Sequence, residues 1–168
     1  KNEDIVDALK IPHRHGVQFS VNNITGFPGE TRQLAMDTVE INRLIDADNH
    51  NIYSFVPFHG TPLRTKCEKL GLIQPEVLTK CLTDDPVLVL EEYPFAEISG
   101  LKKCFILYVK FPKSRWAEIR RAESDTPEGK QLYESLKEEY MDQYFQYPDD
   151  NPHSEMPRTA DLEYGLES

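Results

Sequence analysis

The stretch NNITGFPGET, residues 22–31, decides the fold class because it joins a strand-like segment to a helix-like one. Before it, residues 17–21 alternate between apolar and polar, the period-two pattern of a strand with two different faces. After it, apolar residues recur every three or four positions over residues 31–46, which predicts an amphipathic helix. A second strand-like run, NIYSFVPF at residues 51–58, follows. Strand, helix and strand predict a parallel βαβ unit in an α/β fold.

The rest of the chain is mostly helical by pattern. Within residues 95–111, CFILYV is a strand by propensity and a helix segment by context, and both interpretations stay open. We expect a barrel-like part over residues 1–72, a helical extension over 73–147 and a poorly ordered Pro-, Asp- and Ser-rich tail over 148–168. The individual helices are predicted at residues 2–10 (ended by Pro12 and Gly16), 63–71, 75–82, 95–111, 113–124 and 127–147.

Length and charge limit the classes of function. The 168 residues suit one modest core, and no apolar run approaches the ~18 residues that span a bilayer. Net charge is -10 with mean hydropathy -0.57, so we expect no membrane and no nucleic acid as main partner. A cytoplasmic protein is the default expectation. The sequence begins at Lys1 without Met, which indicates a piece of something longer.

The cysteines do not have the spacing of a metal site. Cys67, Cys81 and Cys104 match no close-spaced zinc or redox pair, and we expect packed, reduced thiols and no metal ligands. No pairing of a base with a nucleophile is visible near the strand ends, so no catalytic residue is assigned. A barrel hydrolase or lyase ranks last for the same reason.

The corner between strand and helix favours ligand binding. Carboxyl ends of parallel strands face the crevice where α/β folds bind ligands. Gly26 and Gly29 allow a tight turn and close approach of a ligand, and Glu30 suits the first helical turn. Asn22 offers amide donors and acceptors at the strand end. A plain turn without a ligand is the alternative, while a phosphate-binding loop lacks its Lys and its longer glycine spacing.

The second strand ends in FVPFHGTPL, residues 55–63. Phe58 could stack on a flat heteroaromatic ring and His59 could hydrogen-bond it. The alternative places Phe55 and Phe58 in the core and makes His59 a turn residue.

These two strand ends together resemble the radical S-adenosylmethionine (SAM) enzymes, most closely the subgroup with an amino-terminal cobalamin-binding domain. GFPGET looks like the end of the family's fifth strand, and FVPFHGTPL looks like the end of its sixth. The run GLKKCFILYVKFPKSRWAEI is similar to a helical extension after the barrel in that subgroup. The resemblance implies the last two βα units of a partial (β/α)6 barrel followed by that extension.

By resemblance, the strand ends contact the adenine of SAM. The fifth-strand Ile of the family maps to Ile24, and the end of its sixth strand maps to residues 56–58. The chain departs from the commoner family pattern, which has Gly where Asn22 stands and Glu one position earlier than Glu30. The expected cofactor-binding residues are Asn22, Ile24, Gly26, Gly29, Glu30, Val56, Pro57, Phe58 and His59.

The Cys-x3-Cys-x2-Cys motif that holds the family's 4Fe-4S cluster is absent from the chain. The resemblance therefore implies a fragment whose partner is the upstream half of the same enzyme, with a small-molecule substrate, SAM, a 4Fe-4S cluster and, in the subgroup, cobalamin. The fragment alone is not expected to be active. A severed barrel would expose a strand edge that favours self-association. The alternative function is a non-catalytic, acidic interaction or scaffold domain whose Tyr133, Tyr140 and Tyr144 meet a partner or pack in the core.

Overall fold

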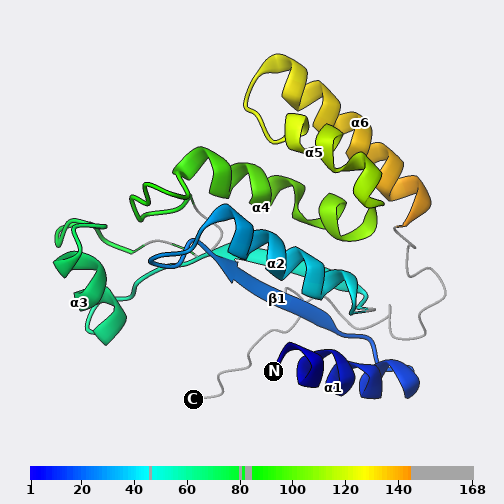
Figure 1. The fold of residues 1–168 in the computed structure, drawn as a ribbon, viewed down its shortest axis with the longest axis horizontal. Helices are drawn as coiled ribbons and strands as arrows, with labels where there is room; N and C mark the ends of the chain where they lie inside the picture. The colour runs from blue at the N-terminus through cyan, green and yellow to red at the C-terminus, as the bar shows by residue number, and fades with distance from the viewer. Residues whose placement is uncertain (46, 80, 82–84, 145–168) are drawn as a thin grey trace, which may run out of the picture.

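A computed structural model describes residues 1–45, 47–79, 81 and 85–144 of the chain. Two strands and a series of helices make up these residues (Figure 1). The amino-terminal part contains α1 (Asn2–Arg14), β1 (Ser20–Thr25), α2 (Arg32–Arg43), β2 (Asn49–Ser54) and α3 (Pro62–Lys69). The carboxyl-terminal part contains α4 (Phe95–Lys110), the 3-10 turn η1 (Lys113–Arg115), α5 (Trp116–Ala122) and α6 (Pro127–Gln143).

The α/β class and the parallel sheet predicted from the sequence are confirmed. β1 and β2 pair in parallel, with Ser20 opposite Asn49 at one end and Thr25 opposite Ser54 at the other. α2 connects the two strands, as a parallel pair requires. Within the described residues the sheet has these two strands, so one βα crossover is complete.

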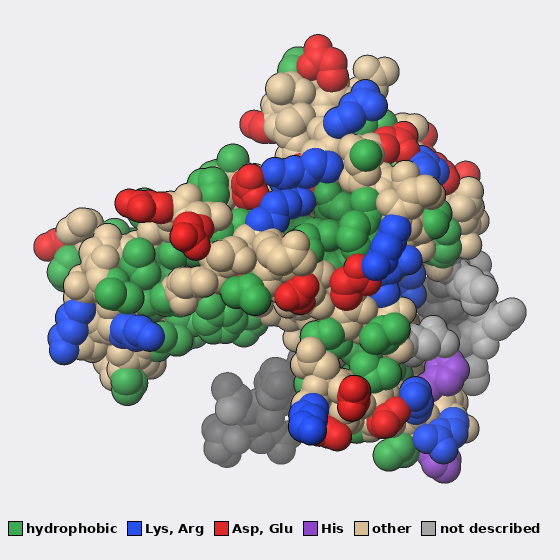
Figure 2. Space-filling view, viewed as in Figure 1, with side chains coloured by type: hydrophobic (Ala, Val, Ile, Leu, Met, Phe, Trp, Pro, Cys, Tyr) green, Lys and Arg blue, Asp and Glu red, His purple; other side chains and the backbone are tan. Residues whose placement is uncertain are grey.

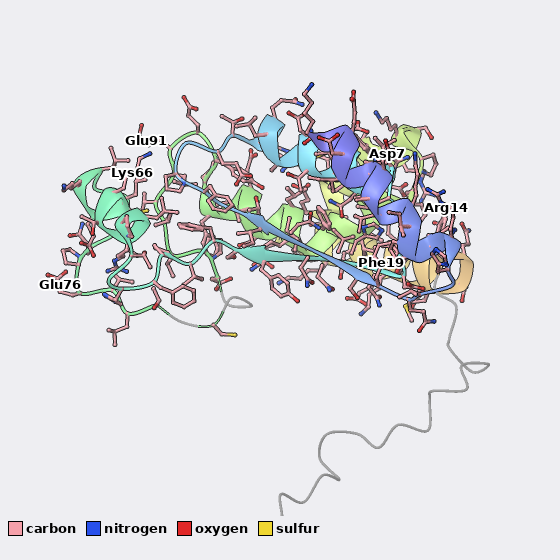
Figure 3. The ribbon with its side chains drawn as sticks, turned by 90° about the horizontal axis from the view of Figure 1, so that it is seen from below. Asp7, Arg14, Phe19, Lys66, Glu76 and Glu91 are labelled. Carbon is pink, nitrogen blue, oxygen red and sulfur yellow. The ribbon has the colours of Figure 1, made fainter. Side chains whose placement is uncertain are left out.

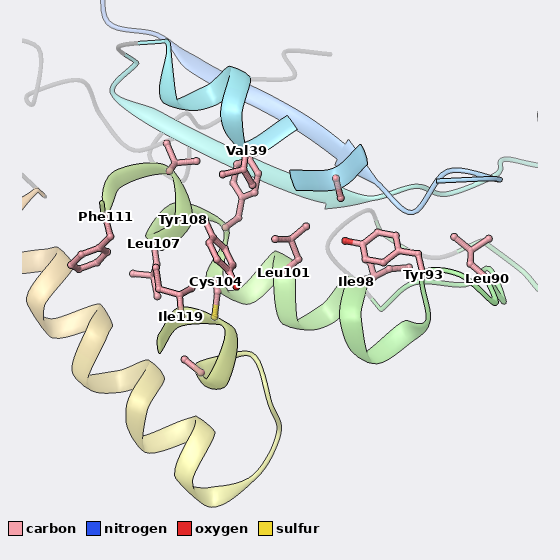
Figure 4. Close-up of a cluster of buried hydrophobic side chains, with 14 of the residues drawn as sticks. Val39, Leu90, Tyr93, Ile98, Leu101, Cys104, Leu107, Tyr108, Phe111 and Ile119 are labelled. Carbon is pink, nitrogen blue, oxygen red and sulfur yellow. The ribbon is translucent and has the colours of Figure 1, made fainter. Parts of the chain in front are cut away.

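Helices cover one face of the sheet. α2 and α4 lie against it, and α5 and α6 pack on α4 away from the strands (Figures 1 and 4). The centre of the core is the buried stripe of α4, which includes Leu101, Cys104 and Tyr108. The CFILYV segment is therefore helical, because its apolar residues meet α2 on one side and α5 and α6 on the other.

Threonines and prolines fix where three helices begin. The side chain of Thr31 accepts a hydrogen bond from the backbone N–H of Leu34, and Thr61 and Thr126 cap α3 and α6 in the same way. Pro62 and Pro127 occupy the first turn, where a missing N–H costs nothing. These local signals begin α3 after the segment 55–61 that follows β2.

Arg43 joins the end of α2 to the end of α4. Its Nη1 donates to the backbone carbonyl oxygens of Tyr108, Val109 and Phe111 at 2.6, 2.8 and 2.6 Å. These carbonyls have no partner within the helix, so the guanidinium satisfies acceptors that would otherwise lack one.

A charged network holds α5 against α2 and α4. Glu123 accepts from Arg32 Nη2 and from the Tyr108 hydroxyl at 2.6 Å each. Its other oxygen accepts from Arg120 at 2.5 Å. Gly100 makes this approach close, since a Cβ there would lie 2.7 Å from the Glu123 Cβ. Burial, followed by the bond to Glu123, raises the pKa of Tyr108, which keeps the hydroxyl protonated.

Some sequence predictions for the first helix and strand were wrong at their ends. α1 continues through Pro12 to Arg14 instead of stopping near residue 10. It ends when Gly16 adopts φ +66° and Val17 N–H bonds to Pro12 C=O, a Schellman-type cap. β1 starts only at Ser20, so Val17, the first residue of the predicted strand, lies outside it and is 55% exposed.

Downstream, the helix predicted over residues 75–82 is not formed in its described part. Residues 75–79 form a turn and irregular backbone. Of the three tyrosines expected to meet a partner or pack in the core, Tyr133 and Tyr140 pack against the buried cluster, whereas Tyr144 is 39% exposed and stacks on Tyr140 at 6.2 Å between ring centroids. The predicted tail, residues 148–168, lies outside the described residues, as do residues 145–147 of the last predicted helix. None of the helices in the described part of the chain is long and apolar enough to cross a membrane.

Candidate functional site at the carboxyl ends of the strands

The two strands end side by side. Thr25 and Ser54 are the last register partners, and the backbone N–H of Phe55 donates to Thr25 C=O at 2.7 Å one residue later. Both segments therefore leave the sheet at the same edge, where parallel strands of α/β folds meet their ligands. Ser54 is buried and its hydroxyl accepts from Lys102 Nζ of α4 at 2.7 Å, which ties this edge to the helical layer.

The first corner, residues 26–31 between β1 and α2, is organised around Glu30. Its carboxylate accepts hydrogen bonds from the backbone N–H of Phe27 at 3.1 Å, from the Thr25 hydroxyl at 3.1 Å and from the N–H of Gly26. Gly26 and Gly29 have φ of +88° and +81°, a region that disfavours other residues. The amides of Gly26 and Phe27 thus bind Glu30 in this structure, and the glycines serve the turn itself.

Helix α4 and the segment before it close the back of this corner. A Cβ on Gly26 would lie 3.5 Å from Ile98 Cδ1, an ordinary contact distance, so Ile98 lies directly behind the corner and the positive φ alone is what favours glycine. The hydroxyls of Tyr93 and Thr25 lie 3.4 Å apart. Burial raises the pKa of Tyr93 to about 12, so its hydroxyl stays protonated at neutral pH.

The second corner, residues 55–61 between β2 and α3, has a buried part and an exposed part. Val56 and Pro57 are buried beneath the edge, whereas Phe58 is 53% exposed and His59 is exposed. Gly60 has φ +79°, and Thr61 then donates its hydroxyl to Phe58 C=O at 2.7 Å while capping α3. Of the two interpretations of Phe58, the core position is wrong, because much of the ring faces solvent.

Apolar side chains gather at the shared edge. Ile24, Phe27 and Phe58 are 44%, 37% and 53% exposed, and the Phe27 and Phe55 rings lie 4.6 Å apart between centroids. Figure 2 shows hydrophobic side chains together between the end of β1 and α3. Exposed aromatic and aliphatic surface of this kind suits a flat apolar or heteroaromatic ligand.

The other face of the sheet is not covered by α2 or α4. In Figure 3 the two strands lie in front of α4, with α1 beside them. Burial alternates along β1, and the residues of the open face are exposed or half-buried. They form three register pairs, Ser20 with Asn49, Asn22 with Asn51, and Ile24 with Tyr53. The period-two alternation predicted for this strand holds from Ser20 on, where Ser20, Asn22 and Ile24 share the open face, whereas Gln18, which the same alternation would add to that face, precedes the strand.

The sequence-predicted residues do not all meet at one point. Ile24, Gly26, Glu30 and Val56 lie at the shared edge, but Gly29 is exposed on the outside of the turn. Pro57, Phe58 and His59 continue from the edge toward α3, and Asn22 lies two residues inside it on the open face. Sequence reasoning missed Phe27, Asn51, Tyr53 and Tyr93. The period-two alternation of NHNIYS would have placed Asn51 and Tyr53 beside Asn22 and Ile24.

The thiols are not arranged as a metal site. Cys67 and Cys104 are buried, and burial raises the pKa of both, to about 12 for Cys104. Cys81 is exposed. Across residues 1–45, 47–79, 81 and 85–144, no three His, Cys, Asp or Glu side chains lie close enough together to hold a metal ion. The described residues therefore do not fit an iron–sulfur cluster.

Comparison with known proteins gives two distant relatives. An uncharacterized methyltransferase of Pyrococcus horikoshii is 29% identical over 109 residues, which cover 64% of this chain and 24% of that protein. An uncharacterized protein of Methanocaldococcus jannaschii is 28% identical over 102 residues, covering 50% of this chain and 32% of that protein. The chain thus spans a third or less of the length of these curated relatives. No protein-family model and no solved structure matches.

Proposed function

We propose that this chain is the carboxyl-terminal part of a radical SAM enzyme and forms part of the wall that contacts the adenine of SAM. One observation carries the proposal: two adjacent parallel strands end together, with Ile24 and Phe58 exposed at the shared edge. The finer assignment, the last two βα units of a partial barrel, agrees with the βαβ order and with the uncovered polar face. In a partial barrel that face would line the interior.

The relative from Pyrococcus horikoshii supports the use of SAM. That protein is named a methyltransferase, and SAM is the usual biological methyl donor. The alignment covers 24% of the Pyrococcus horikoshii protein. The reaction catalysed by the enzyme that contains this chain is therefore part of the proposal. Cluster ligands and a cobalamin domain would lie outside these 168 residues.

The chain's own residues would orient the nucleoside and exclude water. Ile24 and Phe58 offer apolar surface to the purine, while Val56 and Pro57 support the edge from below. Glu30 fixes the turn that carries Gly26, so the edge is held in place before a ligand arrives. The bound cofactor pair of cluster and SAM supplies the one-electron chemistry, and the protein supplies position and electrostatics.

Expression of the complete reading frame, purified without oxygen, tests this function. We expect iron and sulfide in the protein and a reduced-cluster electron paramagnetic resonance spectrum that changes when SAM is added. A complete product that contains no iron and binds no SAM would refute the proposal.

A second candidate is a non-catalytic interaction domain. The exposed Phe27 and Phe58 favour it, because apolar surface at an edge also suits a protein partner. The sequence upstream of Lys1 separates the two functions. Three cysteines at the radical SAM spacing favour the enzyme, and a sequence without them favours the interaction domain.

A further inference from the structure

Asn22 and Asn51 form an amide pair on the open face of the sheet. They are register partners, and Asn51 Nδ2 donates to Asn22 Oδ1 at 3.0 Å. This bond leaves the Nδ2 hydrogens of Asn22 and the Oδ1 of Asn51 without a partner among the described residues. The pair therefore presents a donor and an acceptor next to each other on the exposed surface.

A second asparagine pair holds this arrangement from behind. Asn23 points to the covered face, where its Nδ2 donates to the backbone carbonyl of Asn51 at 2.9 Å and to Asn42 Oδ1 at 3.0 Å. Asn42, in α2, is 1% exposed and returns a bond from Nδ2 to Asn23 Oδ1 at 2.8 Å. The backbone below the exposed pair is thus fixed, which lowers the entropy lost when a ligand binds.

The charge of the face selects the ligand. None of its six side chains is a Lys, Arg, His, Asp or Glu, although the chain has a net charge of -10. An anion would find no cation on this face, and a cation would find no carboxylate. The next rung toward the carboxyl edge is Ile24 with Tyr53, which offers apolar and aromatic surface. The face therefore complements a neutral, flat molecule with one polar edge.

We propose that Asn22 and Asn51 bind a neutral ligand through a carboxamide or lactam edge, with its apolar part on Ile24 and Tyr53. The ligand's C=O accepts from Asn22 Nδ2, and its N–H donates to Asn51 Oδ1. A carboxylate of the same shape lacks that N–H and places negative charge against Asn51 Oδ1. The site shares Ile24 with the proposed adenine contact, but the asparagine pair itself requires neither iron nor SAM, so a titration without both tests it apart from the proposed function.

The test compares benzamide with benzoate on the complete gene product, without iron or SAM, by saturation-transfer NMR titration. We expect benzamide to bind about tenfold more tightly than benzoate, the difference of one well-made hydrogen bond. Asn22→Ala and Asn51→Ala each remove most benzamide binding. Asn49→Ala changes the neighbouring register pair on the same face and leaves benzamide binding unchanged.

An isosteric variant keeps the test decisive if the alanine variants fold poorly. Asn51→Asp keeps an acceptor at this position, loses the Nδ2 donor to Asn22 Oδ1 and adds a negative charge, so binding shifts from benzamide toward the benzamidinium cation. Equal binding of benzamide and benzoate, or full benzamide binding by Asn22→Ala, overturns the proposal. A dimer that buries this face, dissociates in Asn22→Ala and binds no benzamide also overturns it, and sedimentation equilibrium detects that dimer.

Discussion

Thr25 of β1 and Ser54 of β2 are register partners on the last rung of the parallel sheet, and both are 1% exposed. Because these two residues end their strands together, the segments after them lie at one edge. Thr25 donates to Glu30 in the first corner, and Ser54 accepts from Lys102 of α4. The edge is thus fixed by polar contacts to both the corner and the helical layer.

Removal of the Glu30 carboxylate should loosen the first corner. In Glu30→Ala the N–H of buried Gly26 loses its acceptor, so we expect the free energy of unfolding to fall by about 1–3 kcal/mol. Urea unfolding measures the change. Glu76→Ala is the control, since Glu76 is exposed and makes no hydrogen bond to a described residue. Equal stability of the two variants would mean that Glu30 does not organise the corner.

Gly100 should tolerate no side chain. The Cβ of Gly100→Ala would lie 2.7 Å from Glu123 Cβ and force α4 and α5 apart, at a cost of about 1–3 kcal/mol. Thermal unfolding followed by circular dichroism measures it. Ser99→Ala, on the same helix, is the control and should not destabilise, because its buried hydroxyl has no partner in the described part of the chain. A wild-type melting temperature for Gly100→Ala would contradict the close packing.

Glu139 should contribute stability that acid removes. Hydrogen bonds from Arg115 at 2.9 and 3.0 Å lower the pKa of Glu139 below its usual 4.5. A lowered carboxyl pKa gives stability that is present above the unfolded pKa and is lost as pH falls through the folded pKa. We therefore expect Glu139→Gln to cost about 0.5–1 kcal/mol at pH 7 for this solvent-screened pair, and less toward pH 3.

Urea titrations at several pH values measure this difference, because urea is uncharged and does not screen the ion pair. The control is Glu138→Gln, whose exposed carboxylate makes no ion pair with a described residue. A stability difference between wild type and Glu139→Gln that grows below pH 4 would contradict the assignment.

The cysteines should differ in reactivity. Cys81 is exposed, whereas burial removes Cys67 and Cys104 from solvent and raises the pKa of both thiols. A maleimide should therefore label Cys81 quickly in the native protein, and the other two only after unfolding. Mass spectrometry of labelled peptides locates the adducts, and Cys81→Ser should reduce native labelling to background. Rapid native labelling of Cys104 would contradict its burial in the core.

Much of the fold could be predicted from the sequence because local rules decide it. The alternation before Asn22 and the spacing after Thr31 are short-range signals, and they correspond to a strand that begins at Ser20 and to the helix α2. The helical state of CFILYV could not be fixed locally, since packing against α2 and α5 decides it. The helix predicted after Pro75 is not formed over residues 75–79. In this described part no apolar stripe packs against the core, so tertiary packing does not support a helix there.

The candidate site was predictable in part. Strand order and turn residues were enough to predict the shared edge, and alternation was enough to predict the exposed face of Asn22 and Ile24. The sequence could not show that the Gly26 amide donates to the Glu30 carboxylate, because that hydrogen bond depends on the folded conformation of the turn. The Asn22 and Asn51 pair depends on register, which a single strand does not reveal.

Calorimetric titration of SAM into the complete enzyme, with and without changes at the shared edge, tests the central claim most directly. Ile24→Glu and Phe58→Ala should each weaken SAM binding at least about tenfold, because each removes apolar contact with the purine. Ile11→Glu in α1 and Leu44→Ala at the far end of α2 are the controls, at 55% and 69% exposure, and should bind SAM as the wild type does. Unchanged SAM binding in both edge variants would contradict the claim that the two strand ends together form the adenine site.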